Sequence, residues 1–78
     1  MPTVLRIGPY RFFFYAGDRE EPPHVHVERD NLQAKFWLAP ARVAGNMGFK
    51  RKELWRIADI IEENQEYLMG CWDEFFGE

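Results

Sequence analysis

The segment with the clearest capacity for chemistry is HVHVE, in which His24, His26 and Glu28 alternate with two valines. In an extended strand, side chains two residues apart point to the same face and lie roughly 7 Å apart. Two imidazoles at that spacing can chelate one divalent cation such as Zn, Mn or Fe. His24 and His26 are therefore predicted metal ligands, and the preceding loop could supply a third. The loop carboxylates in reach are Asp18, Glu20 and Glu21.

The same segment also fits acid–base catalysis without a metal. Imidazoles titrate near neutral pH. Together with a carboxylate and a cation, they resemble the catalytic groups of a small ribonuclease. The predicted catalytic set is His24, His26, Glu28, Arg11 and Lys35. A third interpretation has no site at all, only the solvent face of a strand whose valines point inward. The residues alone leave these three interpretations open.

A second candidate site lies where the C-terminal helix is expected to begin. Residues 42–56 hold five basic side chains against Glu53 alone. Positive charge at a helix N-terminus opposes the helix dipole, at a cost of about 0.3–1 kcal/mol per well-placed charge. One interpretation is an anion site for phosphate or an acidic partner; the alternative is that the charges are simply solvated. The predicted phosphate- or partner-binding residues are Arg42, Lys50, Arg51 and Lys52.

Composition sets limits on the class of protein. The chain has 78 residues, of which 17% are aromatic, so we expect one globular domain over residues 1–78. The net charge of −3 argues against nucleic-acid binding that is driven mainly by electrostatic attraction. Cys71 is the single cysteine and cannot form an intrachain disulfide. With neither a signal peptide nor a membrane-spanning stretch in the sequence, a cytoplasmic protein is expected.

Hydrophobic periodicity predicts the elements that position these residues. Alternating patterns predict strands at about 3–7, 10–16, 24–29 and 32–38, with a loop over 39–48. Spacing of i, i+3 and i+4 then predicts one helix over about 50–76. The expected fold class is α+β: a four-stranded antiparallel meander with one long C-terminal helix packed on one face.

The length of this helix raises a question about its end. At 1.5 Å per residue it would span about 40 Å, whereas a seven-residue strand is about 23 Å long. The helix must therefore break, near Asn64–Glu66 or Gly70, or overhang the sheet. An overhang would expose a predicted interface of Trp72, Phe75 and Phe76, and a second chain or a partner protein would then have to cover it.

The whole chain resembles a bacterial family, the domain-of-unknown-function 4160 family. The resemblance is carried by four stretches: PTVLRIGPYRFFFYAGD, EPPHVHVERD, AKFWLAPARVAGNMGF and ELWRIADIIEEN. It implies a small stand-alone protein, often encoded beside another small protein as in toxin–antitoxin pairs. It carries over no catalytic residues, although His24 and His26 lie inside the signature string. Lys50 departs from the family, whose members more usually have Ser or another capping residue there.

Together these observations predict a small cytoplasmic component of a toxin–antitoxin-like two-protein module, acting on RNA through the His/Glu strand face. The alternatives are a divalent-metal-binding module without catalysis and a pure protein-interaction or dimerisation domain. The expected partners are a second copy of the chain, a small cognate protein, or both, together with RNA and no membrane.

Overall fold

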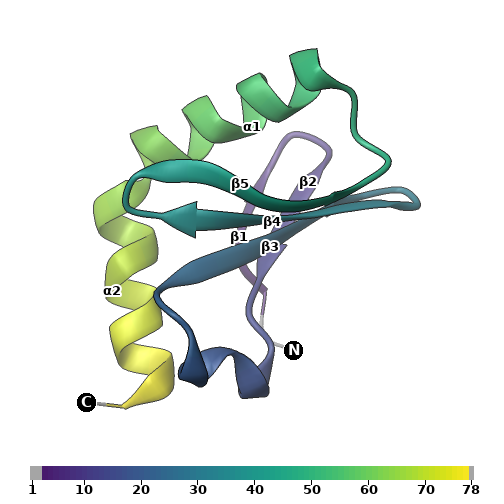
Figure 1. The fold of residues 1–78 in the computed structure, drawn as a ribbon. Coiled ribbons are helices and arrows are strands. Elements are labelled where there is room, and N and C mark those ends of the chain that lie inside the picture. The colour runs from purple at the N-terminus through teal and green to yellow at the C-terminus, as the bar shows by residue number, and fades with distance from the viewer. Residues whose placement is uncertain (1–2, 78) are drawn as a thin grey trace.

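The computed structural model describes residues 3–77, which form an antiparallel sheet covered on one face by two helices (Figure 1). This confirms the α+β class, with one more strand and one more α-helix than the sequence predicted. The elements in chain order are β1 (Thr3–Ile7), β2 (Tyr10–Phe13), the 3₁₀ helix η1 (Ala16–Glu20), β3 (His24–Arg29), β4 (Leu32–Leu38), β5 (Ala41–Met47), α1 (Arg51–Glu63) and α2 (Gln65–Phe76).

The strands form a simple meander in the order β1-β2-β3-β4-β5, every pair antiparallel. The predicted bounds of β1, β3 and β4 are confirmed. β2 is shorter than predicted, because it ends at Phe13 and the chain leaves the sheet before η1. The backbone N–H of Tyr15, predicted to lie in the strand, instead donates to the Asp18 carboxylate at 2.9 Å.

The segment predicted as a loop over 39–48 contains β5, which corrects the four-strand prediction. Its sequence, ARVAGNM, is rich in residues that disfavour strands. The segment is extended because it pairs with residues 33–38 of β4. A register shift accommodates Ala44 between the pairs Phe36↔Val43 and Lys35↔Gly45. Pairing with a neighbouring strand, which local sequence does not reveal, therefore creates this edge strand.

The predicted single helix is two helices, which corrects the helix prediction in favour of a break at the first expected place. α1 ends at Glu63 and α2 starts at Gln65, with Asn64 between them. Asn64 has φ −114° and ψ 20°, and its side-chain amide donates to the Ile60 carbonyl at 2.8 Å. Such local side-chain bonds compete with helix continuation. The other predicted position, Gly70, lies within α2.

Because of this break, α2 leaves the direction of α1 at a steep angle and crosses the sheet instead of overhanging it, as Figure 1 shows. Trp72 is consequently 8% exposed, in edge-to-face contact with Phe14 at 5.3 Å between ring centroids. The alternative of an overhanging helix with an exposed Trp72 is therefore wrong, because the chain itself covers Trp72. Phe76 is half-buried against Phe14 and Trp72, and Phe75 is 40% exposed.

The helices and one face of the sheet enclose the core. The fully buried side chains of this layer include Phe12, Phe14, Val25, Val27, Phe36, Leu38, Ile57, Ile61 and Leu68. Each of these side chains stabilises the fold by about 1.5–3 kcal/mol relative to an exposed position. Because side chains alternate along a strand, the residues between them on β2, β3 and β4 face the other side of the sheet. His24 and His26 are on that opposite side.

An ion-paired cluster attaches the start of α1 to β3. Arg29 holds the Glu53 carboxylate with both ends of its fork, Nε–Oε2 at 2.5 Å and Nη2–Oε1 at 2.8 Å. The Tyr10 hydroxyl donates to the same carboxylate at 2.7 Å. Glu53, at the third position of the helix, therefore binds the sheet, and Lys50 at the N-cap makes no side-chain capping bond.

Within residues 3–77, neither helix is long and apolar enough to cross a membrane.

Candidate metal centre

The short helix η1 places one carboxylate over the start of β3. The chain leaves β2 at Phe13, turns through Ala16–Glu20 and returns to the sheet at His24. Asp18 lies in this turn, and its Oδ2 accepts the Tyr15 backbone N–H at 2.9 Å. That bond fixes the carboxylate, whose side chain is only 12% exposed. Of the three loop acids considered from the sequence, Asp18 contacts both histidines, at 3.1 and 3.0 Å, whereas Glu21 Oε1 lies 3.9 Å from His24 Nδ1.

His24 is the most deeply placed member of the group. It is fully buried, between Trp37 and Trp72, with ring centroids 5.8 and 5.2 Å from its own. Its Nδ1 lies 2.9 Å from the carbonyl oxygen of Pro22. Because a carbonyl only accepts, Nδ1 carries a proton and the neutral ring has its lone pair on Nε2. The double proline thus fixes both the start of the strand and the tautomer of the first histidine.

The Nε2 atom of His24 is a buried polar atom without a hydrogen-bond partner among the described residues. Asp18 Oδ1 lies 3.1 Å from it, but outside hydrogen-bond geometry. A lone pair facing a carboxylate oxygen at this distance is repulsive unless a cation or a second proton lies between them. This contact is the most informative feature of the site.

His26 completes the group from the same face of β3, as the alternation predicted. Its Nε2 lies 3.0 Å from Asp18 Oδ2, and its ring centroid is 5.2 Å from that of His24. Phe13 stacks on the ring and Tyr15 meets it edge-on, at centroid distances of 5.6 and 4.5 Å. Burial lowers the pKa of His26, although Asp18 acts to raise it. The lowered pKa favours the neutral ring, which is the form that binds a metal.

One ligand atom from each of Asp18, His24 and His26 lies within 4.8 Å of the other two. Ligand atoms bound to one ion at about 2.1 Å are about 3.0–3.4 Å apart, so small side-chain movements would bring all three onto one cation. Although burial raises it, the bond from the Tyr15 N–H helps to hold the pKa of Asp18 below its usual value, which keeps the carboxylate ionised. Two imidazoles and one carboxylate suit Zn, Mn or Fe(II).

Two predicted catalytic residues lie on the same face but bind each other. Arg11 and Glu28 are cross-strand partners with Nη1 and Oε1 3.3 Å apart, and the guanidinium lies over the Phe13 ring at 4.3 Å. Within residues 3–77, no hydrogen bond or ion pair joins either of them to Asp18, His24 or His26. Their predicted role in catalysis stays a prediction.

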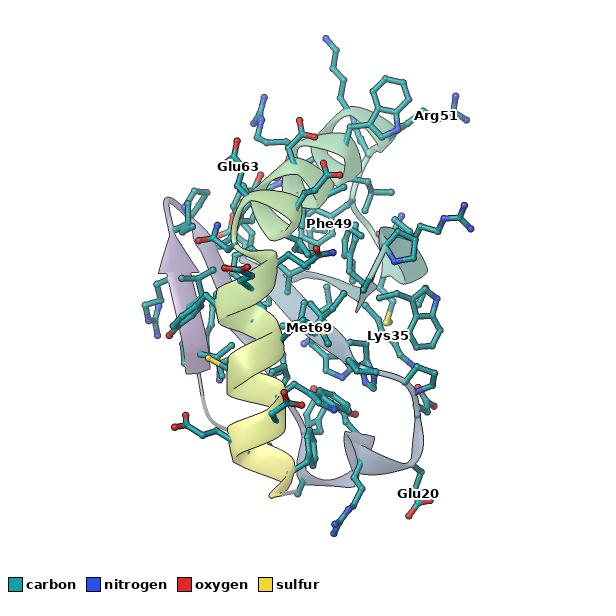
Figure 2. The ribbon with its side chains drawn as sticks, turned by 90° about the vertical axis from the view of Figure 1, so that its left-hand side faces the viewer. Glu20, Lys35, Phe49, Arg51, Glu63 and Met69 are labelled. Carbon is teal, nitrogen blue, oxygen red and sulfur yellow. The ribbon has the colours of Figure 1, made fainter. Side chains whose placement is uncertain are left out.

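The other predicted helper, Lys35, lies directly across from His26 on β4. Its ammonium binds the Glu21 carboxylate and lies 5.1 Å from the centre of the Trp37 ring. Contact with Lys35 lowers the pKa of Glu21. Glu21 is therefore engaged at the rim of the site, while Glu20 is exposed and points away from the body of the protein (Figure 2).

The predicted anion-binding residues do not form a single group. Lys50, Arg51 and Lys52 are exposed at the start of α1, where Figure 2 shows Arg51 at the opposite end of the molecule from Glu20. Arg42 lies at the opposite end of β5, across from Trp37. It lines a separate cavity of about 320 Å³ with Pro22, Pro23 and Met69, among others.

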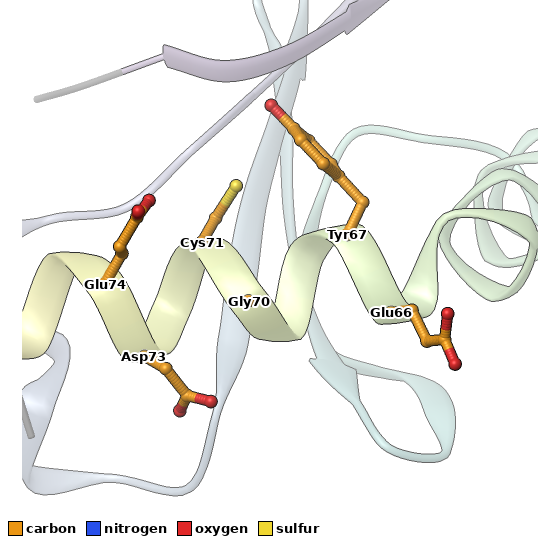
Figure 3. A pocket seen from close by; sticks show the side chains of 6 residues that line it. All are labelled: Glu66, Tyr67, Gly70, Cys71, Asp73 and Glu74. Carbon is orange, nitrogen blue, oxygen red and sulfur yellow. The ribbon is translucent and has the colours of Figure 1, made fainter.

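A larger cavity, of about 500 Å³, runs along the outer side of α2 (Figure 3). Tyr67, Cys71 and Glu74 point to one side of the helix and Asp73 to the other. The Tyr67 hydroxyl donates to the Val4 carbonyl at 2.7 Å. This surface shares no lining residue with the histidine cluster, so volume alone does not identify the chemical site.

Sequence reasoning did not select Asp18 over its neighbours, and it missed the positioning atoms around the cluster. Those are the Pro22 carbonyl, the Tyr15 N–H and the walls formed by Trp37 and Trp72. The PPH string could have indicated the first of them, since a carbonyl two residues before a histidine can reach Nδ1. The others depend on η1 and on the break at Asn64, which bring distant segments together.

The fold and the site define a small α+β domain with a two-histidine, one-carboxylate cluster on the open side of its sheet. The family described as Domain of unknown function (DUF4160) matches residues 10–73, and the chain belongs to this family. The match includes Asp18, His24 and His26. Searches of curated proteins and of solved structures found no match.

Proposed function

We propose that this protein binds one divalent transition-metal ion through Asp18, His24 and His26. The observation that carries the proposal is the fully buried Nε2 of His24, which has no hydrogen-bond partner in the part of the chain that the structure describes and lies 3.1 Å from a carboxylate oxygen. A cation between these atoms converts a repulsive contact into two attractive ones.

The surroundings of the three side chains support the same conclusion. Metal-binding histidines commonly donate their second ring nitrogen to a carbonyl, which orients the ring. The bond from His24 Nδ1 to the Pro22 carbonyl is such a contact. The Tyr15 N–H holds Asp18 in the same way. The arrangement therefore has both ligands and the contacts that position ligands.

The test is metal analysis of untagged protein purified without chelator. We expect about one equivalent of metal in the wild type, and affinity at least roughly 100-fold lower in Asp18→Asn and His26→Gln. Glu28→Gln is the matched control, because Glu28 lies on the same strand face but pairs with Arg11. We expect Glu28→Gln to bind metal as the wild type does.

A second measurement separates a metal from a proton as the bridging cation. Metal at 100 times its dissociation constant stabilises the folded protein by about 2.7 kcal/mol, so added Zn(II) or Mn(II) should raise the melting temperature of the wild type and of Glu28→Gln. If neither ion is retained and neither changes the melting temperature, an imidazolium–carboxylate pair explains the cluster and the metal proposal is wrong.

The predicted action on RNA as part of a toxin–antitoxin-like module stays a separate prediction. Two imidazoles that share a carboxylate support it as general acid–base groups. Incubation of RNA with wild type and with His26→Gln, both with and without metal, tests it. Cleavage that depends on His26 would support the prediction, whereas identical, intact RNA in all samples would contradict it.

A further inference from the structure

The strand β5 leaves one edge of the sheet without a neighbouring strand. It is the last strand in the sheet order, and β4 pairs with its other side. At the opposite edge, the Tyr67 hydroxyl of α2 donates to the Val4 carbonyl of β1 at 2.7 Å. Within residues 3–77, no group outside the sheet makes such a bond to the backbone of β5. Because unpaired N–H and C=O groups along an edge are a template for another strand, β5 is the edge open to a second chain.

The helices do not close either face of β5. Val43 pairs with the buried Phe36 and so lies on the face that the helices cover, yet it is 43% exposed. Met47 pairs with Gln33 on the other face and is 73% exposed. Apart from its register shift, β5 has none of the usual protection of an edge strand, since its sequence contains no lysine, proline or acid. A strand can therefore reach this edge from solvent.

The charge around this edge is of one sign. Residues 39–52 contain four bases and no acid, although the whole chain has a net charge of −3. Arg42 lies near the start of β5, and Lys50, Arg51 and Lys52 follow its end. All four are exposed, and within residues 3–77 none of them forms an ion pair. Unpaired positive charge thus lies beyond both ends of the open edge and is complementary to an acidic partner.

We infer that β5 is the docking edge for an extended, acidic segment of a partner protein. The segment adds to the sheet beside β5, and its carboxylates meet Arg42 at one end and the bases at the start of α1 at the other. Backbone hydrogen bonds supply affinity in this mode of recognition, and side-chain charges supply selectivity. The inference is independent of the metal centre, because none of its residues is a proposed ligand.

The test uses the full-length protein and a fluorescently labelled peptide of about nine residues, long enough to span a strand of this length. The peptide has glutamates at both ends and alternating valine and threonine between them. Two matched peptides are compared with it. One has lysine in place of glutamate, and the other keeps the glutamates but is N-methylated at its central amides, so that these cannot donate hydrogen bonds. We expect fluorescence anisotropy to show binding of the acidic peptide at least about tenfold tighter than that of either control.

A pair of charge reversals locates the binding surface. We expect Arg42→Glu to weaken binding of the acidic peptide about tenfold, because attraction at one end of the edge becomes repulsion. Arg19→Glu is the matched control, since Arg19 is an exposed arginine of η1 and makes the same change in net charge. We expect it to change the affinity much less. Amide hydrogen exchange should show that the acidic peptide protects β5.

Several results would overturn the inference. One is failure of the acidic peptide to bind more tightly than the lysine peptide. Equal binding of the N-methylated peptide would show charge attraction without strand addition. Equal losses in Arg42→Glu and Arg19→Glu would show that the peptide binds elsewhere. Protection of β5 that grows with protein concentration in the absence of peptide would identify a second copy of the chain as the occupant instead.

Discussion

At the scale of residues, the chemistry of this protein depends on one buried nitrogen. His24 has its Nδ1 committed to the Pro22 carbonyl and its Nε2 directed at Asp18. The side chain cannot turn to water, because it is fully buried between aromatic rings. The conflict between its lone pair and the carboxylate therefore belongs to the folded protein, and whatever relieves it must bind between the two groups.

Asp18→Asn tests this conflict in the metal-free protein. The amide oxygen would keep the Tyr15 N–H and the amide nitrogen would donate to His24 Nε2. We expect the variant, treated with chelator, to be more stable than chelator-treated wild type by about 1 kcal/mol, while losing metal binding. Urea unfolding at neutral pH measures the difference. A clear loss of stability would indicate that an imidazolium–carboxylate pair was removed instead.

Glu53 makes a second residue-scale prediction, on pH. Its pair with Arg29, together with the Tyr10 hydroxyl bond, lowers the pKa of Glu53 in the folded protein despite partial burial. A carboxylate with a lowered folded pKa contributes stability above its unfolded pKa, about 4.3, and this contribution disappears as the pH falls through the lower folded value. We expect Glu53→Gln to reduce stability at pH 7 and to lessen the acid sensitivity between about pH 4.3 and the folded pKa.

Thermal unfolding across this pH range measures the effect of Glu53→Gln. Glu63→Gln is the control, because Glu63 is an exposed acid on the same helix. Equal pH dependence in wild type and Glu53→Gln would show that the cluster with Arg29 does not stabilise the fold.

At the scale of elements, α1 begins with a residue that does not cap it. Lys50 has the extended backbone of an N-cap, φ −82° and ψ 160°, and no side-chain bond to the first turn. We expect Lys50→Asp to stabilise the protein by about 1 kcal/mol, through a capping bond and a favourable charge near the helix dipole. Chemical denaturation measures this change. Lys52→Asp, two residues further along in the first turn, separates capping from charge alone. No gain in Lys50→Asp would contradict the capping argument.

At the scale of the whole molecule, the break at Asn64 decides how much of the aromatic C-terminus is available to another chain. Trp72 is buried and Phe76 half-buried, so Phe75, 40% exposed, is the member of the predicted interface that still faces outward. It lines a cavity of about 410 Å³ with Tyr67 and the start of β1. A partner chain that contacts this end would meet Phe75 first.

The predicted homodimer is tested through Phe75. We expect light scattering to give the mass of two chains for the wild type and of one chain for Phe75→Ser, because Phe75 is the member of the predicted interface whose ring still faces outward. Trp55→Ser is the control, since Trp55 is 67% exposed on α1, away from this end. A single-chain mass for the wild type would contradict the homodimer prediction.

The sequence by itself determined the α+β class, the bounds of three strands and the shared face of His24 and His26, because alternation and helical spacing are local signals of burial. It also indicated a helix break near Asn64.

Only the tertiary structure decided the rest. β5 exists through pairing with β4, which its poor strand formers do not encode. Asp18, and not Glu20 or Glu21, contacts both histidines because of η1, a turn held by bonds between Tyr15 and Asp18 just after β2. The burial of His24 under Trp72, 48 residues later, required α2 to cross the sheet. Contacts between segments so distant in sequence depend on chain topology, and no local pattern records them.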